Sequence, residues 1–327
     1  MDSVSRFMTA ATLSDPIFHD ADKARAHFEK VRWPDGRTCP HCGVVGDDQS
    51  TLLNGKAHRA GLYKCNACSA QFTATIGTVY EDSKVPLNKW LLAMHLMCAS
   101  KKGISALQLQ RELALGSYRT AWFMAHRIRE AMIGTDDAPL GGEGKVVEAD
   151  ETYYGKPAIS PTLRTNGTPF LKRKKPRNSR PVVALVERGG RAKVFHVAVA
   201  DKKTVQRLVI ENVHPATRLH TDESRLYTGA ADVFASHETV KHSAGEYARG
   251  DVNTNSAEGF FGVFKKGMKG VYQHCSEKHL NRYVTEFGFR HNTRAALGYN
   301  DTQRTDLAIL GTVGKRLTYR RADEAYV

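Results

Sequence analysis

The stretch PVVALVERGGRAKVFHVAVA, residues 181–200, decides the fold of the second half of the chain. Two apolar runs rich in β-branched residues flank Arg188-Gly189-Gly190-Arg191, and a Gly-Gly pair between such runs is a hairpin-turn signal. The runs 181–190 and 192–200 are therefore predicted to form antiparallel strands. A third strand is predicted upstream at KVVEAD, residues 145–150.

Beyond this hairpin, helical and strand patterns follow one another. KTVQRLVIENV (203–213) predicts a helix, and RLHTD (218–222) and HETVKHS (237–243) predict two more strands. A further helix is predicted to begin at Thr254 or Asn255. Antiparallel strands followed by helices and further strands predict an α/β domain with a mixed sheet.

Length and composition exclude several classes of protein. A chain of 327 residues is long enough for two or three domains. Its 41% of hydrophobic residues excludes a wholly disordered or low-complexity protein. No run of 18 apolar residues occurs, and the first residues lack the basic-then-apolar pattern of a secretion signal. We therefore expect an intracellular protein without a membrane partner.

Charge points to a class of partner. Lys and Arg number 48 against 34 Asp and Glu, which gives a formal net charge of +14. A surface of this sign favours a polyanion such as nucleic acid. The alternative is a basic protein whose charge serves only solubility.

Four of the six cysteines form two matched pairs, CPHC (Cys39 and Cys42) and CNAC (Cys65 and Cys68), with 22 residues between them. Two-residue spacing lets both thiolates of a pair reach one ion, and two pairs complete a tetrahedral structural zinc site. A disulfide framework is disfavoured for a chain without a secretion signal. We predict a zinc ribbon over residues 31–82.

A helical region is predicted over residues 83–140, after an N-terminal helical segment at 1–30. ISALQLQREL (104–113), a break at Gly116 and SYRTAWFMAHRIREAM (117–132) fit a helix-turn-helix that binds DNA. A plain helical hairpin is the alternative. In the second helix, an apolar stripe leaves these polar residues facing away from the core: Arg119, Thr120, His126, Arg127 and Glu130. We expect DNA contacts from Arg119 and Arg127.

Three acidic residues fall at positions where active sites gather in α/β proteins. Asp150 and Asp222 are predicted to end strands, and Glu258 lies in the first turn of the last predicted helix. Acidic groups aimed at one point repel each other unless a cation is present. Two Mg²⁺ or Mn²⁺ ions there would suit phosphodiester chemistry. For any single carboxylate, a helix cap or surface acid is the alternative.

The helix that carries Glu258 is predicted to be amphipathic. At about 100° per residue, Glu258, Lys265 and Lys269 lie within about 40° of one another, with Asn255 about 60° from Glu258. Lys265 and Lys269 could hold a phosphate of the DNA backbone near the metals. An intrahelical Lys/Glu surface is the alternative. The opposite side gathers an apolar stripe: Phe260, Phe264, Met268 and Val271.

Three blocks of sequence resemble a known family: ADETYYGK (149–156), HTDES (220–224) and NTNSAEGFFGVFKKGMKGVYQHCSEKHLNRYVTEFGFRHNTR (253–294). Over about residues 20–300 the chain resembles the bacterial insertion-sequence transposases of the ISXO type. The resemblance implies an RNase H-like DDE catalytic domain at 141–300, preceded by the zinc ribbon and followed by a C-terminal tail at 301–327.

The resemblance also implies residue roles. Asp150, Asp222 and Glu258 would be the DDE triad, with 35 residues between the last two. Lys265 matches the family's basic residue seven positions after the Glu. Asn255 is the alternative for the third position of the triad. The location implied is the bacterial cytoplasm, at the nucleoid.

The segment 156–180 carries eight Lys or Arg and no acid. We expect a mobile basic loop that becomes ordered on DNA, with Lys172, Arg173, Lys174 and Lys175 as contacts. A solvated insertion or a localisation-like signal is the alternative. Arg282, Arg290 and Arg294 are expected to add phosphate contacts from the next helix.

These features together predict a DNA transposase that binds terminal inverted repeats and catalyses metal-dependent cleavage and strand transfer. Both steps need two DNA ends held together, so a homodimer or larger assembly on DNA is expected. Two alternatives stay open: a catalytically silent DNA-binding regulator derived from a transposase, and a structure-selective nuclease with the same fold.

Overall fold

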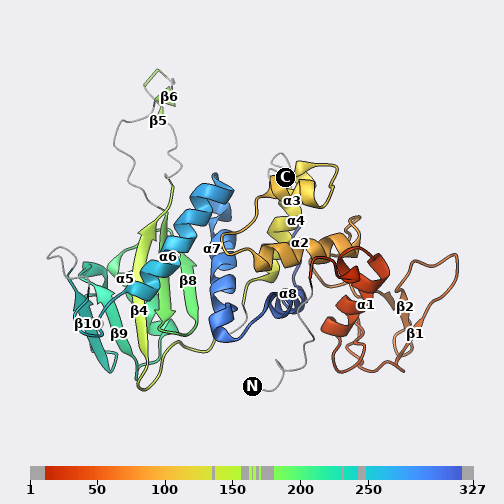
Figure 1. Cartoon of the computed structure of the whole chain (residues 1–327), viewed down its shortest axis with the longest axis horizontal. Helices are drawn as coiled ribbons and strands as arrows, with labels where there is room; N and C mark the ends of the chain where they lie inside the picture. The colour runs from red at the N-terminus through yellow and green to blue at the C-terminus, as the bar shows by residue number, and fades with distance from the viewer. Residues whose placement is uncertain are drawn as a thin grey trace. The chain divides into compact units, whose positions relative to one another are not determined.

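The computed structural model describes residues 12–134, 137–155, 162–163, 165–166, 169–170, 180–229, 232–241 and 248–318. The chain divides into two compact units. The ribbon unit comprises residues 1–134 and 298–327, and the sheet unit comprises residues 135–297. Each is described by itself below, and Figure 1 labels their elements.

Within the described part of the sheet unit, one mixed sheet has the strand order β10-β9-β4-β7-β8. Its strands are β4 (Val146–Tyr153), β7 (Pro181–Glu187), β8 (Ala192–His196), β9 (Arg218–Asp222) and β10 (Ser236–Val240). The pairs β4–β7 and β7–β8 are antiparallel, whereas β4–β9 and β9–β10 are parallel. The predicted α/β mixed sheet of an RNase H-like domain is therefore confirmed.

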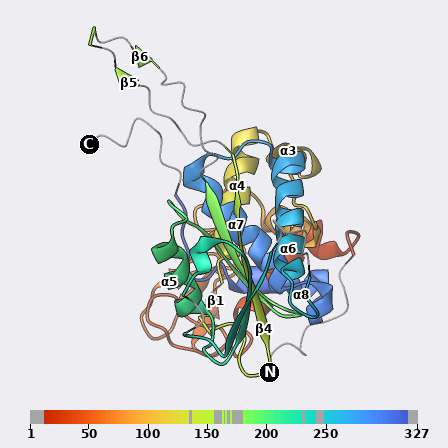
Figure 2. The same ribbon diagram turned by 90° about the vertical axis from the view of Figure 1, so that its left-hand side faces the viewer.

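Helices cover both faces of this sheet, as Figure 2 shows. Helix α5 (Lys202–Asn212) and the short helix η3 (Arg225–Tyr227) pack on the face that carries Val147, Ala149 and Leu219. Helix α6 (Asn255–Gly267) and helix α7 (Glu277–Asn292) pack on the other face. The predicted apolar stripe forms this second core, because Phe260, Phe264 and Met268 are all buried there.

The last predicted helix is shorter than its pattern suggests. Helix α6 ends at Gly267, and a π-helix follows at Met268–Tyr272. Gly267 and Gly270 weaken the α-helix at this point because glycine is a poor helix former. The Tyr272 hydroxyl donates to the buried Glu286 of α7, which ties the end of the π-helix to the core.

Smaller elements complete the sheet unit. Strands β5 (Thr162–Leu163) and β6 (Pro169–Phe170) form an antiparallel pair, and the short helix η6 (Ala295–Leu297) follows α7. Most of the predicted basic loop, including Lys172 to Lys175, lies outside the described residues.

The ribbon unit begins with the short helix η2 (Pro16–Phe18) and helix α1 (Ala21–Arg32). A small antiparallel sheet follows, with strands β1 (Ser50–Leu52), β2 (Tyr63–Cys65) and β3 (Gln71–Phe72) in that order. Its interior is a small cluster of Cys39, Tyr63, Cys65 and Phe72, against which Trp33 packs. So small a core leaves the ribbon dependent on its four cysteines.

The predicted helical pair is present as α3 (Ala106–Glu112) and α4 (Tyr118–Ala131), which follow α2 (Leu87–Ala99). Ser105 and Ser117 cap the two helices by accepting backbone N–H groups with their hydroxyls. The polar face of α4 is narrower than predicted. His126, expected to face away from the core, is 1% exposed, because Met124, Ala125 and Ile128 around it are also buried.

Residues 301–327 were expected to be a tail, but they contain helix α8 (Asp301–Leu310). Ala308 and Ile309 are fully buried, and α8 packs against α1 and α2. His27 Nε2 lies 2.8 Å from Asp306 Oδ1. Helix α8 is therefore part of the ribbon unit's core. Along the described residues, no helix is both long and apolar enough to cross a bilayer.

Candidate metal centres and DNA-contacting residues

The four predicted zinc ligands converge. The Sγ atoms of Cys39, Cys42, Cys65 and Cys68 all lie within 4.8 Å of one another. Cys39 Sγ is 3.8 Å from Cys68 Sγ, and Cys42 Sγ is 3.7 Å from Cys65 Sγ. Tetrahedral zinc with Zn–S bonds of about 2.3 Å places its sulfurs about 3.8 Å apart. The spacing therefore fits a structural zinc ion.

Both CxxC turns have the same backbone geometry. The N–H of Gly43 donates to the carbonyl of Cys39, and the N–H of Ser69 donates to the carbonyl of Cys65. Gly43 and Ser69 both have positive φ, at 78° and 61°. The backbone N–H of Cys68 lowers the pKa of the Cys65 thiol to about 7. Against the backbone N–H of Val44, burial and the three other thiols raise the pKa of Cys42 to about 12. Four thiolates at this spacing therefore require a cation.

Two of the three predicted acidic residues lie on neighbouring strands. Ala149 of β4 pairs with Thr221 of β9, so Asp150 and Asp222 are the next residues on the two parallel strands. Ala149 packs toward α5, and side chains alternate along a strand. Asp150 and Asp222 therefore lie on the face that α6 covers.

Asp222 ends its strand as predicted, but Asp150 does not. Strand β4 continues to Tyr153, because Glu151, Thr152 and Tyr153 pair with β7. What stops near Asp150 is the parallel pairing of β4 with β9, whose last partners are Ala149 and Thr221. The two aspartates thus flank the point where β4 and β9 separate.

Glu258 comes to this face from helix α6. Its backbone N–H donates to the carbonyl of Thr254, and its Oε1 accepts the Thr254 hydroxyl at 3.0 Å. Among the described residues, the cysteines are the one group of three or more metal-ligating side chains with ligand atoms within 4.8 Å. The oxygens of Asp150, Asp222 and Glu258 are therefore not drawn together as tightly as the four thiols.

The three acids nevertheless affect one another electrostatically. Burial raises the pKa of Asp150 from 3.8 to about 7, and the charges of Glu151, Asp222 and Glu258 act in the same direction. The N–H of Glu151 opposes them by donating to Asp150 Oδ1. A cation at this place would relieve the repulsion, and carboxylate oxygens are the ligands that Mg²⁺ and Mn²⁺ prefer. The donor set therefore fits a divalent metal.

Glu151 has a different environment from Asp150, as alternation predicts. Its carboxylate accepts the Tyr227 hydroxyl at 2.8 Å and the Ser224 hydroxyl at 3.4 Å. Burial raises the pKa of Glu151, and the charge of Asp222 adds to the effect. Glu151 therefore connects β4 to the segment just after Asp222 rather than to α6.

The sequence interpretation missed Glu148. This side chain is 0% exposed on β4, two residues before Asp150 and on the same face. The available signal was an acidic residue within the apolar run VVEA, which requires a partner if the strand is buried.

The remaining residues predicted from α6 and its extension are exposed. Asn255, Lys265 and Lys269 all face solvent. The Lys265 Nζ lies 6.0 Å from the centre of the Phe261 ring. These positions leave both lysines accessible to a bound polyanion.

The basic residues predicted to contact DNA divide into two groups. Arg119 on α4 is exposed. Arg127 instead donates to the carbonyls of Leu317 and Glu81, and its guanidinium lies 4.9 Å from the Phe123 ring centre. These contacts hold Arg127 within the ribbon unit.

Two arginines of the sheet unit are also held by the protein. Arg290 is buried and paired with Glu286, and Arg294 donates to the carbonyl of Gly190 at 2.9 Å. They differ from the expected phosphate contacts because their guanidiniums satisfy groups inside the fold. Arg282 lies 3.2 Å from His279 Nδ1 and is half-buried.

The fold and these sites define a class of protein with two modules. A four-cysteine ribbon is followed by an RNase H-like mixed sheet, and Asp150 and Asp222 lie on adjacent strands of that sheet. Comparison with known families gives the particular kind. Residues 139–292 match the ISXO2-like transposase domain, and residues 19–71 match the transposase zinc-ribbon domain. The resemblance found in the sequence is thus confirmed, and the two domains indicate a transposase and imply DNA binding.

One relative supports this identification. The chain is 28% identical over 273 residues to an uncharacterized protein in transposable element ISH50 of Halobacterium salinarum. The similarity covers 80% of this chain and 87% of the relative. It therefore extends beyond either domain alone.

Proposed function

We propose that this chain is a DDE-type DNA transposase that binds the terminal inverted repeats of an insertion sequence, cuts there and joins the freed 3′-hydroxyl to target DNA. The observation that carries the proposal is the position of Asp150 and Asp222 on adjacent parallel strands, beneath the helix that carries Glu258. The transposase domain match supports the same conclusion.

Asp150, Asp222 and Glu258 would hold the catalytic Mg²⁺ or Mn²⁺ ions. When bound, such ions activate the attacking hydroxyl and neutralise charge on the phosphodiester. The raised pKa of Asp150 supports this assignment, because burial and the neighbouring charges of Glu151, Asp222 and Glu258 disfavour its ionised form without a cation. Glu258 rather than Asn255 is the proposed third residue, because Mg²⁺ and Mn²⁺ prefer a carboxylate to a neutral amide.

Lys265 has a proposed role in holding substrate. It lies seven residues after Glu258, which is about 10 Å along a helix axis. An exposed ammonium at this distance can bind a backbone phosphate of DNA whose reactive bond lies at the acids. Lys269, on the π-helix that follows, would extend the same contact.

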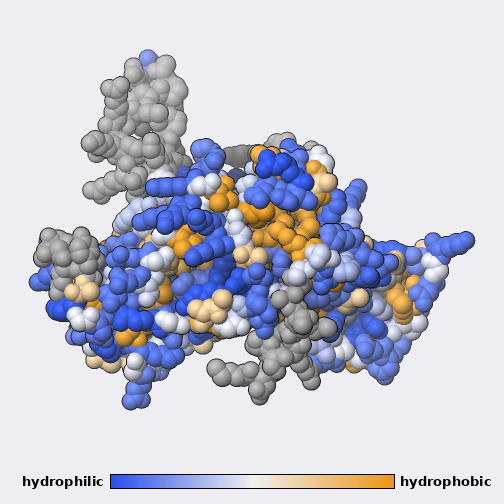
Figure 3. Space-filling view, viewed as in Figure 1, coloured by the Kyte–Doolittle hydropathy of each residue, from blue (hydrophilic) through white to orange (hydrophobic). Residues whose placement is uncertain are grey.

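Specific end binding is assigned to the helical region, with the ribbon in support. Arg119 on the exposed side of α4 is the proposed contact from the helix pair, whereas Arg127 is proposed to hold the carbonyls of Leu317 and Glu81. Hydrophilic residues cover most of the face shown in Figure 3, and the chain carries a net charge of +14. The positive charge favours a polyanionic partner.

The proposed limits of the catalytic domain follow the sheet unit, residues 135–297, in place of the predicted 141–300. Because strand transfer needs two element ends together, the active form is proposed to be a homodimer or a larger assembly on DNA. The cytoplasm, at the nucleoid, is the proposed location.

A strand-transfer assay tests the function. The full chain, loaded with zinc, is incubated with DNA carrying the flanking ends of its element, target DNA and Mg²⁺. The wild type is expected to give joined products, and Asp222→Asn none, although it binds the ends equally. Nicking without joining would favour the nuclease alternative. End binding without cleavage in either protein would leave a DNA-binding regulator.

A further inference from the structure

Helix α6 begins without the usual cap. Its N-cap residue is Thr254, whose side chain makes no capping hydrogen bond. The first backbone N–H groups of a helix have no partner within it, and an N-cap side chain normally accepts one of them. The Thr254 hydroxyl is instead donated to Glu258.

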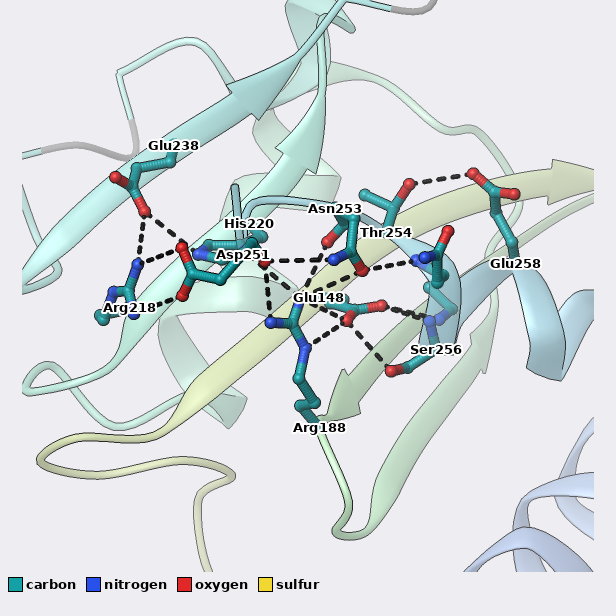
Figure 4. A network of polar contacts seen from close by, with 12 residues as sticks. Glu148, Arg188, Arg218, His220, Glu238, Asp251, Asn253, Thr254, Ser256 and Glu258 are labelled. Carbon is teal, nitrogen blue, oxygen red and sulfur yellow. Dashed lines mark hydrogen bonds and ion pairs between the residues drawn. The ribbon is translucent and has the colours of Figure 1, made fainter. Parts of the chain in front are cut away.

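A residue of the sheet accepts these N–H groups in place of the cap. Glu148 Oε2 accepts the backbone N–H of Ser256 at 2.6 Å and that of Ala257 at 3.1 Å. Glu148 Oε1 accepts the Ser256 hydroxyl at 3.0 Å. A negative charge at this end is also favoured by the helix dipole. Figure 4 shows these contacts.

Arg188 supports Glu148 from the β7–β8 turn. Its Nε donates to Glu148 Oε1 at 2.9 Å. The same guanidinium donates to the carbonyls of Asp251 and Asn253, in the segment that leads into α6. Asn253 Oδ1 in turn accepts the N–H of Asn255, so the start of the helix is held at several points.

The position of Glu148 on β4 relates the start of α6 to Asp150. Glu148 and Asp150 are two residues apart on one strand, so they share a face at a separation fixed by the strand, about 7 Å. Glu258 is one turn into the helix that Glu148 holds. The same short piece of β4 therefore determines where both Asp150 and Glu258 lie.

We propose that Glu148, held by Arg188, is the positioning residue that sets Glu258 opposite Asp150, and that it frees the Thr254 hydroxyl to orient the Glu258 carboxylate. The proposal rests on the proposed function, because it assumes that Asp150 and Glu258 share a metal site. Glu148 is buried and both of its oxygens accept hydrogen bonds from protein donors, so no ligand role is proposed for it. Its role is the geometry of the site.

Glu148→Gln tests this role, because an amide in either orientation places an NH₂ group against the N–H donors or the guanidinium. The matched control is Glu286→Gln, since Glu286 is also 0% exposed and paired with an arginine, but lies on α7. Mn²⁺ affinity is measured by calorimetry on zinc-loaded full-length protein, together with thermal unfolding and the Mn²⁺ dependence of strand transfer.

Both substitutions are expected to lower Tm, but only Glu148→Gln is expected to weaken Mn²⁺ binding, by about 10–100-fold. The Mn²⁺ concentration for half-maximal strand transfer should rise in parallel, with the rate largely restored at saturating metal. An unchanged Mn²⁺ affinity in Glu148→Gln, or an equal loss in Glu286→Gln, would overturn the proposal.

A second pair of variants covers the case in which Glu148→Gln does not fold. Thr254→Val removes the hydroxyl that Glu258 accepts while keeping the shape of the buried side chain, and Thr254→Ser retains the hydroxyl. Thr254→Val should weaken Mn²⁺ binding several-fold, and Thr254→Ser should restore it. Equal Mn²⁺ affinities in the two variants would contradict the proposal.

Asp222→Asn distinguishes a failure of the proposed metal site from a failure of the positioning role of Glu148. If Asp222→Asn binds Mn²⁺ as well as the wild type does, the proposed metal site is wrong and the inference about Glu148 falls with it. If Asp222→Asn loses Mn²⁺ but Glu148→Gln does not, the metal site stands and the positioning role alone fails.

Discussion

At the scale of single residues, Asp150 lies in an environment that disfavours its ionised form. Its carboxyl is partly buried, lies beside Glu151 on the chain and experiences the charges of Asp222 and Glu258. A group whose folded-state pKa is about 7 instead of 3.8 favours folding most when it is protonated. That contribution is complete below pH 3.8 and is lost as the pH rises through 7.

The raised pKa of Asp150 predicts how the stability of the protein depends on pH when no metal is bound at the acids. Asp150→Asn cannot ionise, so the Tm difference between the variant and the wild type should grow in favour of the variant between pH 5 and pH 8. Saturating Mn²⁺ should remove that advantage at pH 8, because the metal stabilises the ionised wild type. Thermal unfolding followed by circular dichroism measures both effects. A Tm difference that is independent of pH would contradict the raised pKa.

A second residue-scale prediction separates two arginines of helix α4. Arg119→Ala should reduce the slope of log affinity for element DNA against log salt by about 1, as for the loss of one phosphate contact, with a smaller loss of stability than Arg127→Ala gives. Arg127→Ala should lower the free energy of unfolding by about 1–3 kcal/mol, because its partners are protein carbonyls. Salt-dependent binding titrations and urea unfolding distinguish them. If Arg127→Ala had normal stability but reduced the slope of log affinity against log salt by about 1, Arg127 and not Arg119 would be the DNA contact.

At the scale of elements, the two CxxC turns and the start of helix α6 each depend on a particular backbone geometry. The residue after each CxxC pair adopts positive φ, which glycine does freely and serine only with strain. Helix α6 begins on a sheet residue, not on its own cap. The start of α6 is thus held by Glu148 of β4, whereas each CxxC turn is closed by the residue that follows it.

The two CxxC turns can be compared by one substitution in each. Gly43→Ala should destabilise the zinc-loaded ribbon by about 1 kcal/mol, since a Cβ there meets no neighbour and the cost is conformational. Ser69→Gly should cost nothing or stabilise the ribbon slightly. Competition with a chelator, which reports apparent zinc affinity, measures both. A loss of zinc affinity in Ser69→Gly equal to that in Gly43→Ala would contradict the shared geometry.

The elements that the sequence predicted are those set by local pattern. Two apolar runs and the turn 188–191 predicted β7 and β8, and CxxC spacing predicted the cysteine cluster. Helix α8 was missed, although Asn300 and Gln303 form a capping box that marks its start. The burial of His126 and the contact of Arg127 with Leu317 depend on packing and on residues far along the chain, so local periodicity could not show them.

The candidate site was predictable only in part for the same reason. Asp222 and Glu258 were predicted from a strand end and a helix start, which are local features, whereas the strand predicted to end at Asp150 continues to Tyr153. The exposed face of α6 followed from its period. The role of Glu148 requires the contact between β4 and the first turn of α6, which are more than 100 residues apart. Such a contact leaves no local pattern.

At the scale of the whole molecule, the two units supply complementary parts of the proposed reaction. The ribbon unit contains the zinc turns and the helix pair, and the sheet unit contains the acids and the exposed lysines of α6 and its extension. The strong positive charge of the chain would concentrate it on DNA without sequence preference. Specificity for element ends is then expected from the ribbon unit, and chemistry from the sheet unit.

The central claim is that Glu258 completes an acidic metal site with Asp150 and Asp222. Single-turnover cleavage of element-end DNA in Mg²⁺ tests it most directly, with Glu258→Gln compared with Asn255→Ala at matched end binding. We predict that Glu258→Gln lowers the cleavage rate more than about 100-fold and that Asn255→Ala keeps at least about a tenth of it. Cleavage at the wild-type rate by Glu258→Gln, or its loss in Asn255→Ala alone, would contradict the account.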